Sequence, residues 1–458
     1  MNDLRIDPYV LTKNDIKPAP ASFTGKLKYL GPGFILSASV VGSGELISTT
    51  TLGARAGFIT LWVIIVSCIV KVAIQLEFGK QAIRTGETVM TSLNKLGGPR
   101  FGKRKANWSL WTWLFLWLFK PLQLGGIIGG VAITLNIAFP SISITWFAVI
   151  IGIAVAALVF KGYYFFIEKM SVVLMMLFTL FTIMAVFMLQ NTANAFSLSD
   201  IFEGMGFKLP AATVGFAIAA FGLTGVGGDE IVAYNYWCLE KGYARFAGPF
   251  EDNEEWHNRA RGWIKVMNLD AILSMVVYTL VTAAFYLLGA AILYRSGDIP
   301  KGFEMIETLS KMYTGAYGEW AKVFFLFGSF VVLFSTLFSA LAARTRIFSD
   351  LFGQIGWIDF FNMRQRGNTI AILAWVFPVL WIIALVWVKL PVLMVTIGGV
   401  ITFFMLLIIV YAGLHFRYRQ KQYGLESSAF YDIALWISCI VIFMVGLYGA
   451  IVLFLPAF

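Results

Sequence analysis

The sequence predicts an all-α integral membrane protein with about eleven transmembrane helices, two of which are discontinuous. Three observations predict this fold class. Of the 458 residues, 59% are hydrophobic and only 13% are charged, whereas soluble domains carry about 25% charged residues. The apolar residues come in runs of about 20, the length that crosses roughly 30 Å of hydrocarbon. Two of these runs contain glycines beside carboxylates, a combination that interrupts a helix.

Eleven apolar segments follow one another along the chain, and each is expected to cross the membrane once. They are residues 30–53, 58–83, 108–138, 143–160, 164–190, 209–238, 264–294, 319–345, 369–389, 391–413 and 430–456. The ninth and tenth segments meet at a tight turn around Lys389-Leu390-Pro391. Because eleven is an odd number, the two termini should lie on opposite sides of the membrane.

The lysines and arginines predict the orientation, because loops rich in these residues stay in the cytoplasm. With the N-terminus inside, the inside loops hold 25 of these residues and the outside loops hold 7. We therefore expect a multi-pass protein of a bacterial inner-membrane type, with a cytoplasmic N-terminus and an extracytoplasmic C-terminus. Basic loops facing anionic lipid also account for the net charge of +10, so no nucleic-acid partner is expected.

The scarce histidines and cysteines exclude several kinds of site. His257 and His415 both fall in polar loops, which excludes a histidine metal site or a Ser-His-Asp triad within the membrane. The three cysteines belong to apolar segments, which argues against a disulfide framework. No cofactor is expected. Residues 1–28 are polar, so no cleavable signal is expected there.

The first and sixth segments each contain a break near the middle. The first break reads Gly42, Ser43, Gly44 and Glu45, and the sixth segment holds Thr224, Gly225, Gly227 and Gly228 ahead of Asp229 and Glu230. Each glycine within a helix costs about 1 kcal/mol relative to alanine. A carboxylate at the membrane centre costs several kcal/mol unless it is compensated. Two such breaks in one chain require an explanation.

The positions of the breaks predict an inverted repeat. They lie five crossings apart, so they occupy corresponding places in two five-helix halves that run in opposite directions. Paired interrupted helices of this kind mark the binding site of a secondary transporter. We therefore divide the chain into an N-terminal cytoplasmic segment, a first repeat, an extracytoplasmic linker, a second repeat, and a cytoplasmic loop with the eleventh helix. Their ranges are 1–29, 30–190, 191–208, 209–413 and 414–458.

A simpler role for the carboxylates is helix capping. Glu45, Asp229 and Glu230 would each open the second half of a broken helix, where acidic residues are favourable for local reasons. Capping alone could retain them, but it does not explain why the helices are broken.

At these residues the sequence resembles the Nramp family of divalent-metal transporters. The first two helices follow that family without a gap, through Gly31-Pro32-Gly33-Phe34, Gly53-Ala54-Arg55-Ala56-Gly57-Phe58, Leu61-Trp62-Val63, Gln75 and Thr85-Gly86. Weaker matches continue at Leu135-Asn136 and Asn268-Leu269-Asp270-Ala271. The resemblance implies a fold of the LeuT type, with two inverted five-helix repeats and one extra helix.

The chain departs from the family pattern at the residues that would bind metal. The resemblance puts Gly42 in place of an aspartate ligand, Glu45 in place of an asparagine ligand and Gly227 in place of a methionine ligand. The carbonyl ligand of the sixth helix would map to Thr224. A pair of acidic residues linked to proton movement maps to Leu124 and Ile127, and a histidine maps to Tyr234. These departures indicate a divergent branch without the standard proton coupling.

Several substrates fit these residues. Oxygen ligands suit hard cations such as Mg²⁺ or Mn²⁺, so a divalent metal held by Glu45, Asp229 and Glu230 is the first expectation. The glycines at the breaks, with Ser43 and Thr224, would complete the substrate site. The roomy acidic site could instead take a small organic solute of the amino-acid or amine type. A sensor or scaffold without flux and a membrane enzyme are the remaining alternatives.

Other charged residues in the apolar segments need partners. Glu77 and Lys80, three residues apart on one helix, should form an ion pair, with Lys71 nearby on the same helix. Lys120 could pair with a carboxylate from a broken helix. Asn268 and Asp270 begin the seventh segment and could either line an inner vestibule or merely form a cap at the membrane interface.

Overall fold

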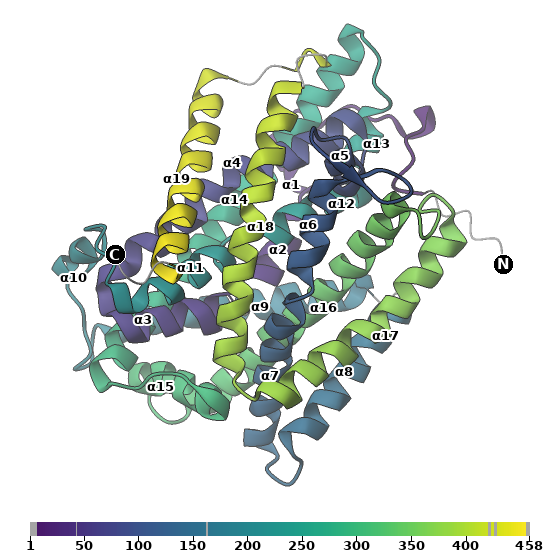
Figure 1. Ribbon diagram of the computed structural model, residues 1–458. Coiled ribbons are helices and arrows are strands. Elements are labelled where there is room, and N and C mark those ends of the chain that lie inside the picture. The colour runs from purple at the N-terminus through teal and green to yellow at the C-terminus, as the bar shows by residue number, and fades with distance from the viewer. Residues whose placement is uncertain (1–6, 43, 162–163, 420–422, 426–427, 455–458) are drawn as a thin grey trace.

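The computed structural model describes residues 7–42, 44–161, 164–419, 423–425 and 428–454 (Figure 1). Nearly all of the elements are helices. In the first half they are α1 (Phe23–Leu27), α2 (Pro32–Val40), η2 (Gly44–Thr49), α3 (Thr50–Ala56), α4 (Leu61–Thr85), α5 (Val89–Asn94), α6 (Trp108–Trp117), α7 (Lys120–Ala138), α8 (Ile144–Lys161) and α9 (Tyr164–Leu189).

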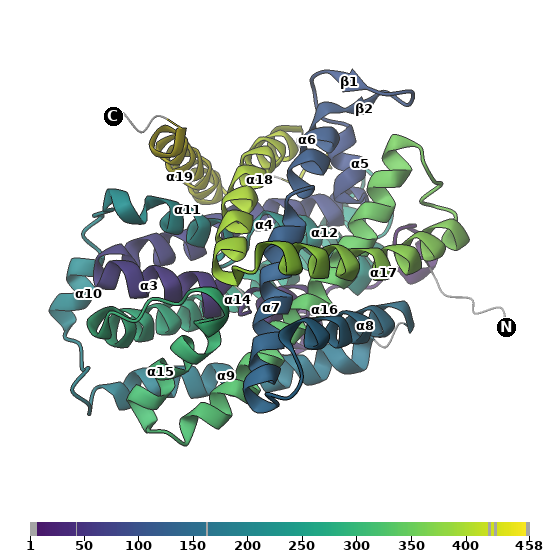
Figure 2. The ribbon, with the colours of Figure 1, turned by 60° about the horizontal axis from the view of Figure 1, so that its bottom comes forward.

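The second half is also helical. Its elements are α10 (Leu198–Gly204), α11 (Val214–Leu223), α12 (Gly228–Lys241), α13 (Tyr243–Ala247), α14 (Glu254–Leu288), η5 (Gly289–Tyr294), α15 (Met305–Tyr317), α16 (Ala321–Ile355), α17 (Met363–Val388), α18 (Pro391–Arg419) and α19 (Ala429–Phe454). Short helical turns lie at η1 (Lys13–Asp15), η3 (Gly57–Thr60), η4 (Ala211–Thr213) and η6 (Gly302–Glu304). The strands β1 (Arg100–Phe101) and β2 (Ala106–Asn107) form an antiparallel hairpin that projects from one end of the molecule (Figure 2).

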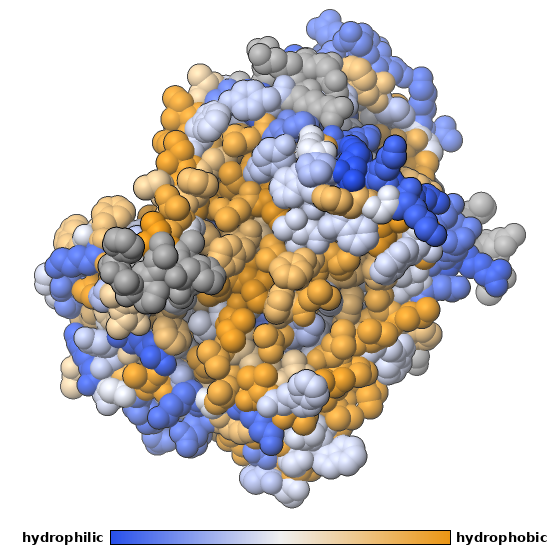
Figure 3. Space-filling model, in the orientation of Figure 1, coloured by the Kyte–Doolittle hydropathy of each residue, from blue (hydrophilic) through white to orange (hydrophobic). Residues whose placement is uncertain are grey.

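The surface is that of a membrane protein. Eight helices in the described residues are long and apolar enough to span a membrane, and two shorter apolar helices, Ile144–Phe160 and Met176–Leu189, accompany them. Hydrophobic residues cover the middle of the face in Figure 3, and hydrophilic residues gather toward its upper right and lower left. The protein is therefore a multi-pass membrane protein, while the count of eleven crossings stays a prediction.

The two predicted interruptions are present. The first apolar segment divides into α2 and the π-helical η2 followed by α3, and the sixth divides into α11 and α12. Parts of the two broken helices contact one another: α2 packs against α12, and η2 packs against α11. Around them α4 packs on α14 and α12, α18 packs on α11 and α7, and α16 packs on α2 and α7. The breaks are thus enclosed by other helices.

Several helices are longer than the apolar segments predict. The seventh was expected at residues 264–294, yet α14 begins at Glu254, where the Asn253 side chain accepts a hydrogen bond of 2.8 Å from the Trp256 N–H. Trp256 and Trp263 are fully buried, so this amphipathic stretch is stabilised by packing outside the apolar run. In the same way α16 continues past the predicted end at residue 345 and ends at Ile355.

Asp270 does serve as a cap, but for α2 and not for the start of the seventh helix, because it lies within α14. Its carboxylate, on α14, accepts hydrogen bonds from the backbone N–H groups of Gly31 at 2.8 Å and Gly33 at 2.5 Å, at the start of α2. The N-terminal N–H groups of a helix have no partner within the helix, so this carboxylate caps α2 from a neighbouring helix. A Cβ on Gly33 would lie 2.8 Å from Asp270 oxygens, which explains the glycine.

Candidate substrate site at the helix breaks

The first break is shaped by glycines that pack closely. A Cβ at Gly42 would lie 1.6 Å from the Thr336 hydroxyl oxygen on α16, so no larger residue fits there without moving α16. A Cβ at Gly44 would lie 3.0 Å from the carbonyl oxygen of Leu223. These two predicted site residues therefore lie where α2, α16 and the end of α11 meet. Ser43 lies outside the described residues.

The second break leaves the chain extended between α11 and α12. Thr224 has φ −70° and ψ 145°, and Gly225 has a φ of +61°, a left-handed value that favours glycine. A Cβ at Gly227 would lie 2.5 Å from Glu230 Oε2, because the half-buried Glu230 side chain folds back over the start of α12. A Cβ at Gly228 would lie 3.1 Å from Met405 on α18.

Glu45 connects the two breaks. Its carboxylate is fully buried, and its Oε1 accepts hydrogen bonds from the Gly225 N–H at 3.3 Å and the Thr282 hydroxyl at 3.1 Å. Its Oε2 is buried and has no hydrogen-bond partner among the described residues. One oxygen of Glu45 is therefore held in place and the other remains available to a ligand.

Asp229 is held by two cations. Its Oδ2 lies 2.8 Å from the Lys120 ammonium and 2.9 Å from the Arg344 guanidinium. The interpretation that Lys120 pairs with a carboxylate of a broken helix is confirmed. Arg344 was missed, although the helical pattern continues through it without a break. The other oxygen, Oδ1, is buried without a hydrogen-bond partner in the described part of the chain.

Thr224 is already engaged by the protein itself. Its carbonyl accepts a short hydrogen bond from the Lys71 ammonium and one of 3.3 Å from the Ser67 hydroxyl. Lys71, fully buried on α4, was expected in the ion-pair cluster near one end of the helix. The Glu77 carboxylate does pair with the Lys80 ammonium at 3.6 Å, and it also pairs with the Arg84 guanidinium at 2.9 Å. Lys71 instead points to the second break.

The three carboxylates do not surround one point in this structure. In the described ranges, no group of three or more His, Cys, Asp or Glu side chains is close enough to hold a metal ion. Lys120 and Arg344 hold Asp229 on one side, while Gly225 and Thr282 hold Glu45. The role of Glu45, Asp229 and Glu230 as metal ligands stays a prediction.

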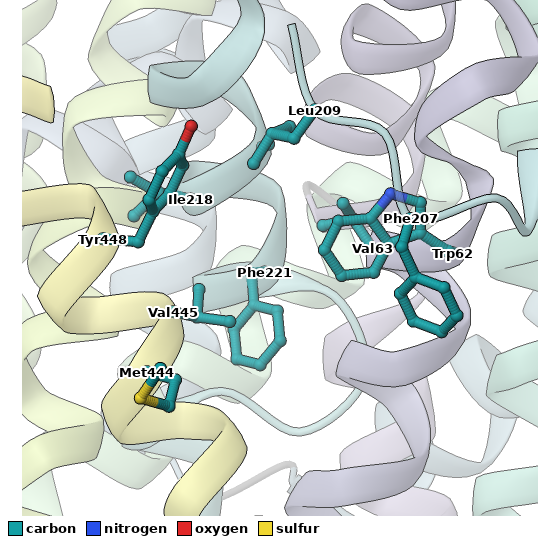
Figure 4. Close-up of a pocket in the computed structure, with 10 residues that line it drawn as sticks. Trp62, Val63, Phe207, Leu209, Ile218, Phe221, Met444, Val445 and Tyr448 are labelled. Atoms are coloured by element: carbon teal, nitrogen blue, oxygen red, sulfur yellow. The ribbon is translucent and has the colours of Figure 1, made fainter. Parts of the chain in front are cut away.

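Two cavities lie near the breaks and differ in chemistry. One, of about 20 Å³, lies between α2, α12 and α16 and is lined by Asp229, Glu230 and Arg344; this is room for about one water molecule. The other, of about 430 Å³, lies between α4, α11 and α19 and is apolar, with Trp62, Phe221 and Tyr448 in its lining (Figure 4). Only the smaller cavity has the polar groups of a substrate site.

Comparison with known proteins agrees with this architecture. The family model described as "Natural resistance-associated macrophage protein-like" (Nramp) matches residues 33–452. The chain belongs to the Nramp family. A divalent metal cation transporter of Caldanaerobacter subterraneus is 24% identical over 327 residues, which cover 70% of this chain and 69% of the relative. An uncharacterized protein of Pasteurella multocida is 24% identical over 356 residues, which cover 74% and 73%.

Solved structures share the fold. A manganese transporter of Eremococcus coleocola, in complex with an aromatic bis-isothiourea compound, has a TM-score of 0.68 at 15% identity, covering 96% of this chain and 90% of that one. The structure of MhsT in complex with L-phenylalanine has a TM-score of 0.58 at 16% identity, covering 96% of this chain and 100% of that one. The resemblance to the Nramp family and the LeuT-type fold are both confirmed. This Nramp protein is a membrane transporter and not an enzyme.

Proposed function

We propose that this Nramp protein moves a divalent metal ion across the membrane by alternating access at the two helix breaks. The observation that carries the proposal is the pair of buried carboxylate oxygens, Glu45 Oε2 and Asp229 Oδ1, without hydrogen-bond partners among the described residues. A buried polar atom without a partner is costly, and a cation bound between the breaks would compensate both. The metal transporters to which the chain is similar support the same cargo.

The donor atoms favour a hard ion, Mg²⁺ or Mn²⁺. Glu45, Asp229 and Glu230 offer oxygen only, and Gly227 contributes no thioether; oxygen ligands suit hard cations. Proton coupling of the standard kind is not expected, because residues 121–138 of α7 contain no titratable side chain. Leu124 and Ile127, which stand in place of the acidic pair, are buried in packing contacts.

A second candidate, a small organic solute, is favoured by the cations fixed in the site. Lys71, Lys120 and Arg344 lie at the breaks beside Glu45, Asp229 and Glu230, so the formal charges already balance. A divalent ion would add two positive charges in a region of low dielectric constant. A zwitterionic solute would instead leave the balance unchanged.

Purified protein in proteoliposomes distinguishes the two candidates. We expect concentration-dependent entry of Mn²⁺ or Mg²⁺, read with a metal-sensitive dye in the lumen and absent from liposomes without protein. Radiolabelled amino acids and amines form the second arm of the experiment. Saturable uptake of one of these solutes with no metal entry would replace metal transport by the second candidate. No flux in either arm would remove both.

A further inference from the structure

Lys71 is a buried cation whose observed partners are main-chain carbonyls. The side chain is fully buried on α4. Its ammonium donates hydrogen bonds to the carbonyl oxygens of Phe221, at 2.8 Å, and Thr224. Within the part of the chain that the structure describes, it forms no ion pair with a carboxylate, unlike Lys80 and Lys120.

The carbonyls are available because α11 ends there. The last carbonyls of a helix have no intrahelical partner and carry the negative end of the helix dipole. The chain then turns away through the extended Thr224 and the left-handed Gly225, so these oxygens remain open toward α4. The hydroxyl oxygen of Ser67, one turn before Lys71, lies 3.0 Å from the carbonyl oxygen of Phe221 and 3.3 Å from that of Thr224, and its single hydrogen can be donated to either.

The remaining surroundings also suit a positive charge. The face of the Phe221 ring lies with its centroid 5.4 Å from the Lys71 ammonium, within the range of a cation–π contact. The Phe221 side chain also lines the apolar pocket of Figure 4. A charge placed here is stabilised by the carbonyl dipoles and the ring, and unwound transporter helices hold free monovalent cations with carbonyls of this kind.

We propose that the carbonyls of Phe221 and Thr224, with the Ser67 hydroxyl, form a monovalent-cation site that the ammonium of Lys71 fills as a tethered ion. The side chain thereby fixes the end of α11 against α4 without a dissociable ion. Shortening Lys71 should open this site to a free monovalent cation, either Na⁺ or a small primary ammonium. The proposal concerns a site next to the cargo and does not depend on whether the cargo is a metal.

The test is chemical rescue of Lys71→Ala, with melting temperature as the readout. The melting temperature of the variant should be lower than that of the wild type, and it should rise saturably with Na⁺ or ethylammonium, by about 2 °C or more near 100 times the dissociation constant. Tetramethylammonium at equal ionic strength can donate no hydrogen bond, and its methyl groups keep the carbonyl oxygens away from its charge, so it should give no rise. The wild type should show no saturable response to any of these cations.

A second variant keeps the proposal testable if Lys71→Ala does not fold. Lys71→Met keeps most of the apolar stem and removes only the charge, so it should fold and respond to Na⁺. The proposal would also be supported if either variant could be purified in folded form only in the presence of Na⁺ and unfolded after exchange into tetramethylammonium. A folded variant that responds to no monovalent cation, or equally to tetramethylammonium, would overturn it.

Discussion

The carboxylate of Asp229 lies between the Lys120 ammonium, at 2.8 Å, and the Arg344 guanidinium, at 2.9 Å, and all three side chains are buried. The three residues come from α12, α7 and α16, so one carboxylate oxygen ties three helices together beside a break. Removing one member of a buried ion pair leaves a buried charge without its partner, which costs about 3–5 kcal/mol.

We therefore expect Lys120→Met to lower the melting temperature clearly. Adding Asp229→Asn to it should restore part of the loss, because the uncompensated carboxylate is then removed. Tryptophan fluorescence during heating in detergent measures both variants. The matched control is Lys322→Met, which breaks the exposed pair with Glu307, worth less than about 1 kcal/mol. If Lys120→Met has the same melting temperature as this control, the ion pair does not hold the helices together.

Glu45→Gln tests the cargo directly. The amide oxygen of glutamine can still accept from Gly225 and Thr282, so the fold should be kept. The lost charge should weaken Mn²⁺ binding about tenfold to a hundredfold, measured by isothermal titration beside a melting curve.

Glu230→Gln should have a milder effect on Mn²⁺ affinity, because its side chain folds back over Gly227 at the start of its own helix. Glu307→Gln, at an exposed residue of α15, is the control and should bind as the wild type does. Unchanged affinity in Glu45→Gln would exclude this carboxylate as a ligand. A fall in melting temperature without a change in affinity would assign it a capping role alone.

Transport should proceed without stoichiometric proton movement, since Leu124 and Ile127 cannot exchange protons. A pH-sensitive dye inside the proteoliposomes should report no change in step with Mn²⁺ entry. Proton uptake at a fixed ratio to Mn²⁺ would show that another carboxylate, with Glu45 as the first candidate, carries protons.

Asp270→Ala should loosen the start of α2. The variant removes both hydrogen bonds to the N–H groups of Gly31 and Gly33, and loss of such a cap costs about 0.5–2 kcal/mol. Amide hydrogen exchange should rise in residues 31–36 and stay unchanged in α18. Equal hydrogen exchange of residues 31–36 in the wild type and in Asp270→Ala would mean that packing alone holds α2.

The orientation follows from the loop charges and can be measured with reporters. A reporter before Asn2 should be cytoplasmic and one after Phe458 should be extracytoplasmic, because 25 lysines and arginines fall in the loops predicted to be inside and 7 in those predicted to be outside. Both reporters on one side would contradict the eleven-helix topology and the inverted repeat with it.

The sequence by itself determined the membrane class and the two broken helices. Both depend on local composition: a run of about 20 apolar residues has few stable places outside a bilayer, and glycines beside a carboxylate weaken a helix wherever it packs. For the same reason, Gly42, Gly44, Gly227 and Gly228 could be placed at the breaks from the sequence.

Only the tertiary structure decided which charges meet. Lys71, Lys120 and Arg344 come from three helices, and no local pattern records that Lys71 points to the end of α11 or that Arg344 lies opposite Asp229. The sequence placed three carboxylates near one site and offered Lys120 as a partner for one of them, but it did not indicate Arg344. Ion pairs within the membrane depend on helix rotation and depth, which are set by packing between helices distant in the chain.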